Sequence, residues 1–192
     1  ILFNKLIISL NDLRRRPNLA VMIGLTVSIL FLVFFGKLAS ETLYENEMHE
    51  FDRIITTFVR YPAGQALDSF MLFVTELGSV TVILALTSIL MAVFLLRGWR
   101  HEANALLVCL AGAGILNQLL KVLYARARPD LFRVVEEYGY SFPSGHSMVS
   151  FCIYGFLAYI FSRDFSSICR SWLIYSVAGI VVSLIGISRI YL

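Results

Sequence analysis

Two short stretches of the chain combine residue types that bind anions and move protons. The first, Lys121 to Asp130, reads KVLYARARPD, and the second, Tyr140 to Met148, reads YSFPSGHSM. Lysine and arginine donate hydrogen bonds to anionic oxygens, and the planar fork of arginine suits two such oxygens at once. Histidine is a common proton donor and acceptor in catalysis. These residue types therefore favour chemistry on an anionic group.

In the first stretch, Lys121 and Arg128 are seven residues apart. That is two helical turns, so the two cations share a face if the helix continues to Arg128. Pro129 disfavours helix at the preceding residue, and we expect the helix to end there. Two cations on one face of a helix end could clamp an anion. The alternative is that both are ordinary interfacial anchors of a helix end.

In the second stretch, Pro143 suits the first turn of a helix, where its missing N–H is not needed. Ser144, Gly145 and His146 would then present free N–H groups. A helix N-terminus binds anions through such donors and through its dipole, and Gly145 lets the backbone approach a ligand closely. The alternative, a capped helix start with an exposed histidine, gives His146 no role.

The composition places these residues in a membrane protein. Of 192 residues, 58% are hydrophobic and 15% are charged, with a mean hydropathy of +0.78, whereas soluble domains carry about 25% charged residues. We therefore predict an all-α, polytopic bundle of transmembrane helices forming a single domain over residues 1–192. Five runs without acidic or basic residues are the predicted spans: Leu19–Gly36, Val80–Leu96, Ala103–Leu120, Ser147–Phe161 and Ser171–Ser188.

Charges between the runs predict the orientation. Arginines come before the first run, between the second and third, and between the fourth and fifth. The opposite segment, residues 38–79, holds seven acidic and two basic residues. The positive-inside rule then puts the N-terminus in the cytoplasm and YSFPSGHSM outside. An alternative for the first run is a cleaved signal sequence, although the run is long for one.

Two segments are predicted to lie in the membrane interface. Within residues 38–79, apolar side chains recur at helical spacing between Phe51 and Val59, with polar ones on the other face. This pattern predicts an amphipathic helix on the outer surface. Residues 1–17 show a similar pattern and are predicted to be a cytoplasmic interfacial segment. The three cysteines have no metal-binding or redox spacing and are expected to be free thiols: Cys109, Cys152 and Cys169.

A second group of cations lies on the predicted outer side, against the positive-inside pattern. It comprises Lys121, Arg126, Arg128, Arg133 and Arg189. Ionisable residues at membrane-proximal helix ends are functional candidates. Ser188 and Arg189 end the fifth run, so they also emerge outside, where Arg189 alone could be an interfacial anchor. Three separate segments are thus predicted to converge on one face.

These three segments resemble the signature of the type 2 phosphatidic acid phosphatases. The resemblance covers the order of the segments, the spacing of their residues and the side of the membrane on which they are predicted to lie. These enzymes are membrane lipid phosphate phosphatases related to acid haloperoxidases. Their signature reads Lys, six residues, Arg-Pro; then Pro-Ser-Gly-His; then Ser-Arg, five residues, His, three residues, Asp. The first part is complete from Lys121 to Pro129 and the second from Pro143 to His146. The third begins at Ser188 and Arg189, and the nucleophilic histidine would be the third residue beyond Leu192.

The resemblance implies a metal-independent phosphatase that works through a phosphohistidine and uses no cofactor. His146 is then the general acid, and phosphate is bound by Lys121, Arg128, Ser144, Gly145 and Arg189. Supporting positions are Pro129, Pro143, Ser188 and Arg126. Family members usually have six spans, so we expect the natural polypeptide to continue and residues 1–192 alone to be inactive.

The expected substrate is an amphiphile, since the site would sit at the outer membrane interface. Candidates are phosphatidic acid, phosphatidylglycerophosphate and polyprenyl pyrophosphates such as undecaprenyl pyrophosphate, and the sequence does not choose between them. Membrane lipids are the expected partners, nucleic acid is not, and no oligomeric state is indicated. The basic cytoplasmic ends and short loops favour a bacterial inner membrane.

Two alternative functions would use the same cations. One is a transporter, which should carry more polar residues in the middle of its spans than Asn117 and Gln118. The other is a non-catalytic relative that binds lipid phosphate.

Overall fold

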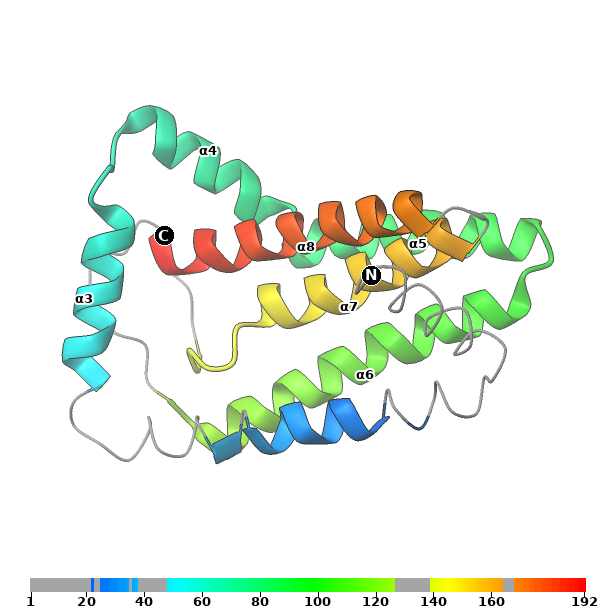
Figure 1. Cartoon of the computed structure of the whole chain (residues 1–192), viewed down its shortest axis with the longest axis horizontal. Coiled ribbons are helices and arrows are strands. Elements are labelled where there is room, and N and C mark those ends of the chain that lie inside the picture. Colours follow the sequence, from blue (N-terminus) through cyan, green and yellow to red (C-terminus); the bar gives the residue numbers. More distant parts are fainter. Residues whose placement is uncertain (1–21, 23–24, 35, 38–47, 127–138, 164–167) are drawn as a thin grey trace, which may run out of the picture. The chain divides into compact units, whose positions relative to one another are not determined.

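In the computed structural model, the described residues are 22, 25–34, 36–37, 48–126, 139–163 and 168–192, and their regular secondary structure is all helical (Figure 1). This confirms the predicted all-α class. Contacts divide the chain into two units, Ile1–Met48 and His49–Leu192. The first unit is represented mainly by the apolar helix Leu25–Phe34, and the predicted interfacial segment 1–17 lies outside the described residues. The following paragraphs concern the second unit.

The second unit is built from six described helices: α3 (Met48–Arg60), α4 (Gln65–Glu76), α5 (Val80–Leu96), α6 (Arg100–Tyr124), α7 (Gly145–Arg163) and α8 (Ile168–Tyr191). Helices α6, α7 and α8 are long and apolar enough to cross a membrane, and α4 with α5 form a bent pair that also qualifies. These helices account for four of the five predicted spans. The first, Leu19–Gly36, is described only in part, and its helix Leu25–Phe34 is shorter than the about 20 residues that a span needs.

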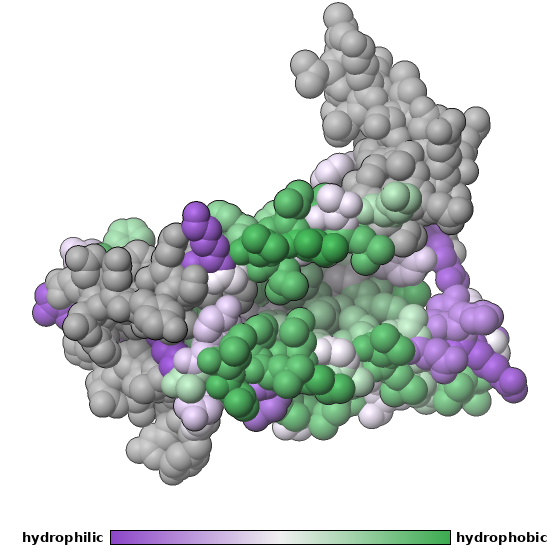
Figure 2. All heavy atoms as spheres, turned by 90° about the horizontal axis from the view of Figure 1, so that it is seen from below, coloured by the Kyte–Doolittle hydropathy of each residue, from purple (hydrophilic) through white to green (hydrophobic). Residues whose placement is uncertain are grey.

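The core of the bundle lies between α5, α6 and α7. Its buried side chains include Ile83, Phe94, Leu106 and Ile153, and the ring of Phe94 stacks on Trp99 with 6.0 Å between centroids. Large apolar side chains also cover the outside of these helices. Figure 2 shows hydrophobic residues over the middle of one face and hydrophilic residues toward its two ends. Apolar exposure on this scale suits a lipid environment.

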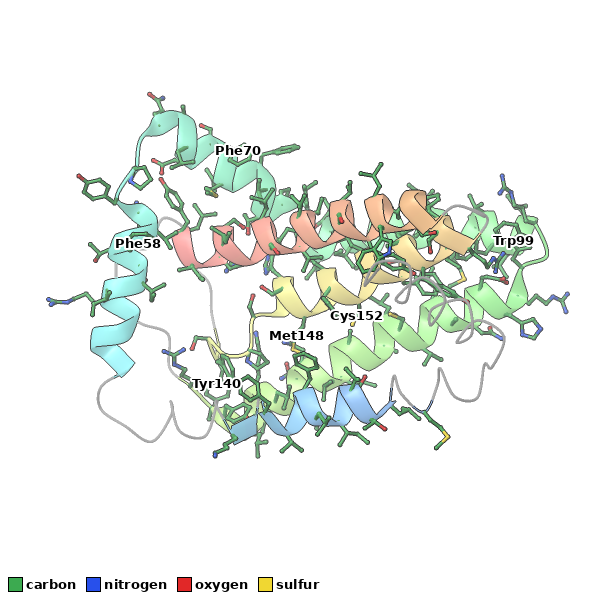
Figure 3. The ribbon with its side chains drawn as sticks, in the orientation of Figure 1. Phe58, Phe70, Trp99, Tyr140, Met148 and Cys152 are labelled. Atoms are coloured by element: carbon green, nitrogen blue, oxygen red, sulfur yellow. The ribbon has the colours of Figure 1, made fainter. Side chains whose placement is uncertain are left out.

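At one end of the bundle, α5, α6 and α7 are joined around Trp99. Arg163 forms an ion pair with Glu102, and the guanidinium groups of Arg97 and Arg163 each lie 5.4 Å from the Trp99 ring centroid. Figure 3 places Trp99 at the opposite end of the helices from Tyr140. Arginines from two of the predicted cytoplasmic ends therefore meet at one end of the bundle.

Residues 38–79 are more helical than the sequence indicated. The predicted amphipathic pattern falls within α3, where Ile54 and Phe58 are exposed. A further helix, α4, occupies part of what was predicted as loop, and it meets α5 at an angle of 43°. The prediction missed α4 because Asp68 and Glu76 interrupt its apolar residues.

The end of α6 also differs from the prediction. The helix ends at Tyr124, and Ala125 adopts a left-handed conformation (φ 41°) while its N–H donates to the Lys121 carbonyl at 2.8 Å. The predicted end of this helix at Arg128 is therefore wrong, because α6 stops four residues earlier, and the condition for a helical face shared by Lys121 and Arg128 is not met. Arg128 and Pro129 lie outside the described residues.

Candidate functional site

A cavity of about 600 Å³ lies where the ends of several helices meet. Its lining comes from the α4–α5 break and α5, from α6, from the start of α7, and from the end of α8: Gly78, Val80, Ile83, Leu84, Leu110, Gly114, Asn117, Lys121, Ser141, Ser144, Gly145, His146, Val149 and Arg189. The structure therefore brings together five predicted site residues: Lys121, Ser144, Gly145, His146 and Arg189. They come from three segments that are far apart in the sequence, and they line one cavity.

The start of α7 has the geometry of a capped helix. The Ser144 carbonyl accepts from the Met148 N–H at 3.0 Å, and the Ser144 hydroxyl oxygen accepts from the Ser147 N–H at 3.4 Å. Ser144 is therefore the N-cap. The amides of Gly145 and His146 stand in the first turn, where a helix supplies no internal acceptor. The Ser144 hydroxyl accepts through its oxygen, so its proton remains available to a ligand.

Pro143 lies one residue before this cap, so its predicted place in the first helical turn is wrong. The physical reason is that Ser144 takes the capping position, with α7 beginning at Gly145. Pro143 is buried and follows a cis peptide bond. Just before it, Ser141 donates from its N–H and its hydroxyl to the Arg126 carbonyl, at 2.9 and 3.1 Å. These bonds join the chain after α6 to the segment that leads into α7.

Arg126 and Ser188 were predicted to support the site, and neither lines the cavity. The Arg126 carbonyl accepts the two hydrogen bonds from Ser141 that are described above. Ser188 is fully buried, and its hydroxyl donates to the Ile185 carbonyl at 2.7 Å within α8.

Arg189 is tied to α4, which sequence reasoning did not anticipate. Its Nη1 donates to the Thr75 hydroxyl oxygen at 3.3 Å, and Tyr191 donates from its hydroxyl to Asp68 Oδ1 at 2.5 Å. The Arg60 guanidinium lies 5.4 Å from the centroid of the Tyr191 ring. Thr75 and Asp68 are more than a hundred positions from their partners, and no local pattern could have paired them.

The break between α4 and α5 lies directly against α7 and α8 at Gly78. A Cβ atom added to Gly78 would lie 2.8 Å from Ile185 Cγ2, 2.9 Å from Ser150 Oγ and 3.4 Å from His146 Cβ. Tyr154 donates from its hydroxyl to the Leu77 carbonyl at 2.9 Å. A side chain at position 78 would force these neighbours to shift, and its absence lets the break form one wall of the cavity beside His146.

Asn117 is a second lining residue that the sequence did not assign to the site. Its Nδ2 donates to the Pro143 carbonyl at 3.3 Å, from a side chain that is 8% exposed. Its position one helical turn before Lys121 was the available signal, because residues four apart share a helix face.

The cavity combines a polar end with an apolar wall. Lys121, Arg189 and the α7 N-terminus supply positive charge and N–H donors, whereas Val80, Leu84 and Leu110 supply apolar surface. No acidic side chain is among its described lining residues. Throughout the described ranges, no group of three or more histidine, cysteine, aspartate or glutamate side chains could hold a metal ion. The arrangement can bind an anionic headgroup together with part of an apolar tail.

Comparisons with known proteins agree with this geometry. The model of the PAP2 superfamily matches residues 102–192. The chain is 31% identical over 162 residues to phosphatidylglycerophosphatase B of Bacillus subtilis (strain 168), covering 84% of this chain and 80% of that protein. Its fold is similar to the crystal structure of a transmembrane PAP2 type phosphatidylglycerolphosphate phosphatase from Bacillus subtilis, with a TM-score of 0.77 and 30% identity over 85% of this chain and 82% of that one.

Proposed function

We propose that this chain, which belongs to the PAP2 superfamily, hydrolyses a phosphate monoester or pyrophosphate of a membrane lipid. The observation that carries the proposal is the meeting of Lys121, the Ser144–His146 segment and Arg189 around one cavity. Both similar proteins are named as phosphatases of phosphatidylglycerophosphate. This lipid is therefore the first candidate substrate, followed by phosphatidic acid and polyprenyl pyrophosphates.

The polar end of the cavity suits a phosphate group. A phosphate monoester carries about two negative charges at neutral pH. Lys121 and Arg189, joined by Arg128 from the same signature, neutralise these charges and stabilise the phosphoryl group during its transfer. The amides of Gly145 and His146 add donors at the positive end of the α7 dipole. The Ser144 hydroxyl donates its remaining proton to a phosphate oxygen.

Hydrolysis then proceeds in two steps, for which the signature supplies the groups. The histidine of the third motif attacks phosphorus, the bond between phosphorus and the lipid oxygen breaks, and His146 donates a proton to that oxygen. Water next attacks the phosphohistidine, the phosphorus–nitrogen bond breaks, and inorganic phosphate leaves while one proton of the water goes to the histidine nitrogen. Neither step needs a metal ion.

The apolar wall supports a lipid rather than a soluble phosphate ester as substrate. Val80 and Leu84 are exposed on α5 while also lining the cavity, so an acyl chain can lie against them beside the phosphate site. By the charge pattern, the site opens on the extracytoplasmic face of a bacterial inner membrane, with the N-terminus in the cytoplasm.

The test uses the polypeptide extended through the third-motif histidine, purified in detergent with phosphatidylglycerophosphate and a metal chelator. We expect inorganic phosphate to be released. Lys121→Ala and Arg189→Ala should each lower the rate by on the order of 10²-fold, the usual cost of removing one group that stabilises a developing charge. Arg100→Ala is the control, because Arg100 begins α6 at the opposite end from Lys121.

Residues 1–192 alone should bind orthovanadate without turnover, since the position of the attacking histidine lies beyond them. Phosphate release by residues 1–192 at the rate of the extended protein would contradict the phosphohistidine mechanism. Vanadate binding by the extended protein without hydrolysis of any of the three lipids would favour the alternative of a non-catalytic lipid phosphate-binding protein.

A further inference from the structure

We infer that Asn117 is a positioning residue: it holds the N-terminus of α7 in register with Lys121, so that both contact the same anion. The inference rests on the proposed role of the cavity in phosphate binding. It assigns a function to a side chain that belongs to none of the three signature motifs.

Asn117 is a buried polar residue in an apolar part of the structure. It lies in the apolar helix α6, and it is buried at 8% exposure. Burying an amide costs free energy unless its groups are hydrogen-bonded. Here Nδ2 donates to the Pro143 carbonyl at 3.3 Å and also lies 3.3 Å from Met148 Sδ. The amide group is thus held by the residue before the α7 cap and by the end of the first α7 turn. In Figure 3, Met148 lies between α7 and α6.

The other atom of the same amide faces the first residue of α7. A Cβ atom added to Gly145 would lie 3.3 Å from Asn117 Oδ1, closer than a comfortable van der Waals contact. The carboxamide is therefore bonded to the chain before Ser144 and leaves no room for a side chain on the residue after it. The amides proposed to bind phosphate, those of Gly145 and His146, lie between Pro143 and Met148, the two residues that contact the Asn117 amide.

Asn117 lies on the same helix as Lys121. Asn117 and Lys121 are four residues apart, so they share one face of α6, and both line the cavity. The hydrogen bond to Pro143 therefore fixes the distance between a cation on α6 and the donors of α7. Pre-organised donors bind an anion without first having to be ordered.

The packing of α6 on α7 does not depend on this one contact. Leu106 and Ile153 are buried in the shared core, and the Cys109 thiol lies 3.5 Å from the Cys152 carbonyl. Loss of the Asn117 hydrogen bond should free the turn before α7 while the two helices stay packed. A variant that lacks this hydrogen bond should therefore lose affinity for the anion while its unfolding temperature changes little.

The first experiment measures orthovanadate binding to residues 1–192 by calorimetry, with thermal unfolding followed in the same detergent. Asn117→Leu keeps the branched four-atom skeleton of the side chain and removes its hydrogen bonds. We expect its affinity for vanadate to fall by about tenfold, the effect of losing one hydrogen bond. The control is Gln118→Leu, because Gln118 is the exposed neighbour of Asn117 and does not line the cavity. Its vanadate affinity should be unchanged.

The second experiment is a double-mutant cycle between Asn117→Ala and Gly145→Ala. The methyl group of Gly145→Ala presses on Asn117 Oδ1, so it should weaken vanadate binding in the unaltered background. Once Asn117→Ala has removed that oxygen, Gly145→Ala should cost several-fold less. Residues that act through one contact give non-additive losses of this kind.

Two results would contradict the positioning role of Asn117 without contradicting the phosphate site. One is that Asn117→Leu and Asn117→Ala bind vanadate as tightly as the unaltered chain. The other is that the fold-losses in vanadate affinity of the two single variants in the cycle multiply to give that of the double variant. If the Asn117 variants lost vanadate affinity only because they were less well folded, their unfolding temperatures would fall together with their affinity. That result would also contradict a positioning role. If the unaltered chain bound no vanadate at all, the phosphate site itself would be wrong, and the inference would fall with it.

Discussion

At the residue scale, the position of His146 allows its proposed role to be separated from simple phosphate binding. It is the second residue of α7, it is half-buried, and it lines the cavity together with Gly145, the residue before it. A histidine at this place could bind phosphate, donate a proton to the leaving group, or attack phosphorus. These roles respond differently to the chemistry of the leaving group.

His146→Ala should therefore slow the hydrolysis of a lipid phosphate far more than that of nitrophenyl phosphate. A lipid alcohol needs a proton as its bond breaks, whereas nitrophenolate leaves as a stable anion. General acid catalysis contributes about 10²–10⁴-fold, and we expect a loss in that range for the lipid alone. The measurement is the rate of phosphate release by the extended protein, with the exposed His101 changed to Ala as a matched control. Equal losses on the two substrates would end the general-acid assignment.

At the element scale, the break between α4 and α5 depends on the absence of a side chain at one position. A Cβ on Gly78 would come within 2.9 Å of atoms on both α7 and α8. Overpacking of this kind costs about 1–3 kcal/mol, so Gly78→Ala should lower the free energy of unfolding by that amount.

Gly112→Ala is the matched control, because Gly112 lies inside α6 with nothing within 4 Å of an added Cβ. It should stabilise the helix by about 0.5–1 kcal/mol. Thermal unfolding in detergent compares the two variants. A Gly78→Ala protein as stable as the unaltered chain would show that the break can move away from α7 and α8.

The end of α6 gives a second prediction at this scale. Ala125 has a φ of 41°, a conformation that costs an L-residue roughly 1–2 kcal/mol and glycine almost nothing. Ala125→Gly should therefore raise the free energy of unfolding, by about 1 kcal/mol once the greater chain entropy of glycine is subtracted. Chemical denaturation at fixed detergent concentration is the measurement. Destabilisation would mean that the helix does not end at Tyr124.

At the scale of the whole molecule, the orientation in the membrane is the main open prediction. Cysteine variants at Tyr61 and His101 test it, because both side chains are exposed and they fall in segments predicted to face opposite sides. In a background without the native cysteines, an impermeant maleimide should label position 61 in intact cells and position 101 only after permeabilisation. The reverse pattern would invert the topology.

The sequence predicted four of the five spans and the segments that line the cavity, because apolar runs and charge at helix ends are local signals. It did not predict α4, whose contacts with α8 through Thr75 and Asp68 join distant parts of the chain. It placed the end of α6 too late, because alanine gives no sign of a left-handed turn. Asn117 was seen only as a polar residue near a helix end, since its partner Pro143 is 26 positions away.

The bend at Gly78 also bears on how a lipid reaches the site. Helix α5 has 17 residues, or about 26 Å at 1.5 Å per residue, and the hydrocarbon core of a bilayer is about 30 Å thick. In the proposed orientation, with α5 upright from the inner boundary of the hydrocarbon core, the cavity wall at Gly78 lies a few ångströms inside the outer boundary of that core. The headgroup of a bound substrate must then lie deeper in the membrane than the headgroups of the surrounding lipids. A thinner bilayer reduces this difference in depth, so substrate should enter the site more easily in thinner membranes.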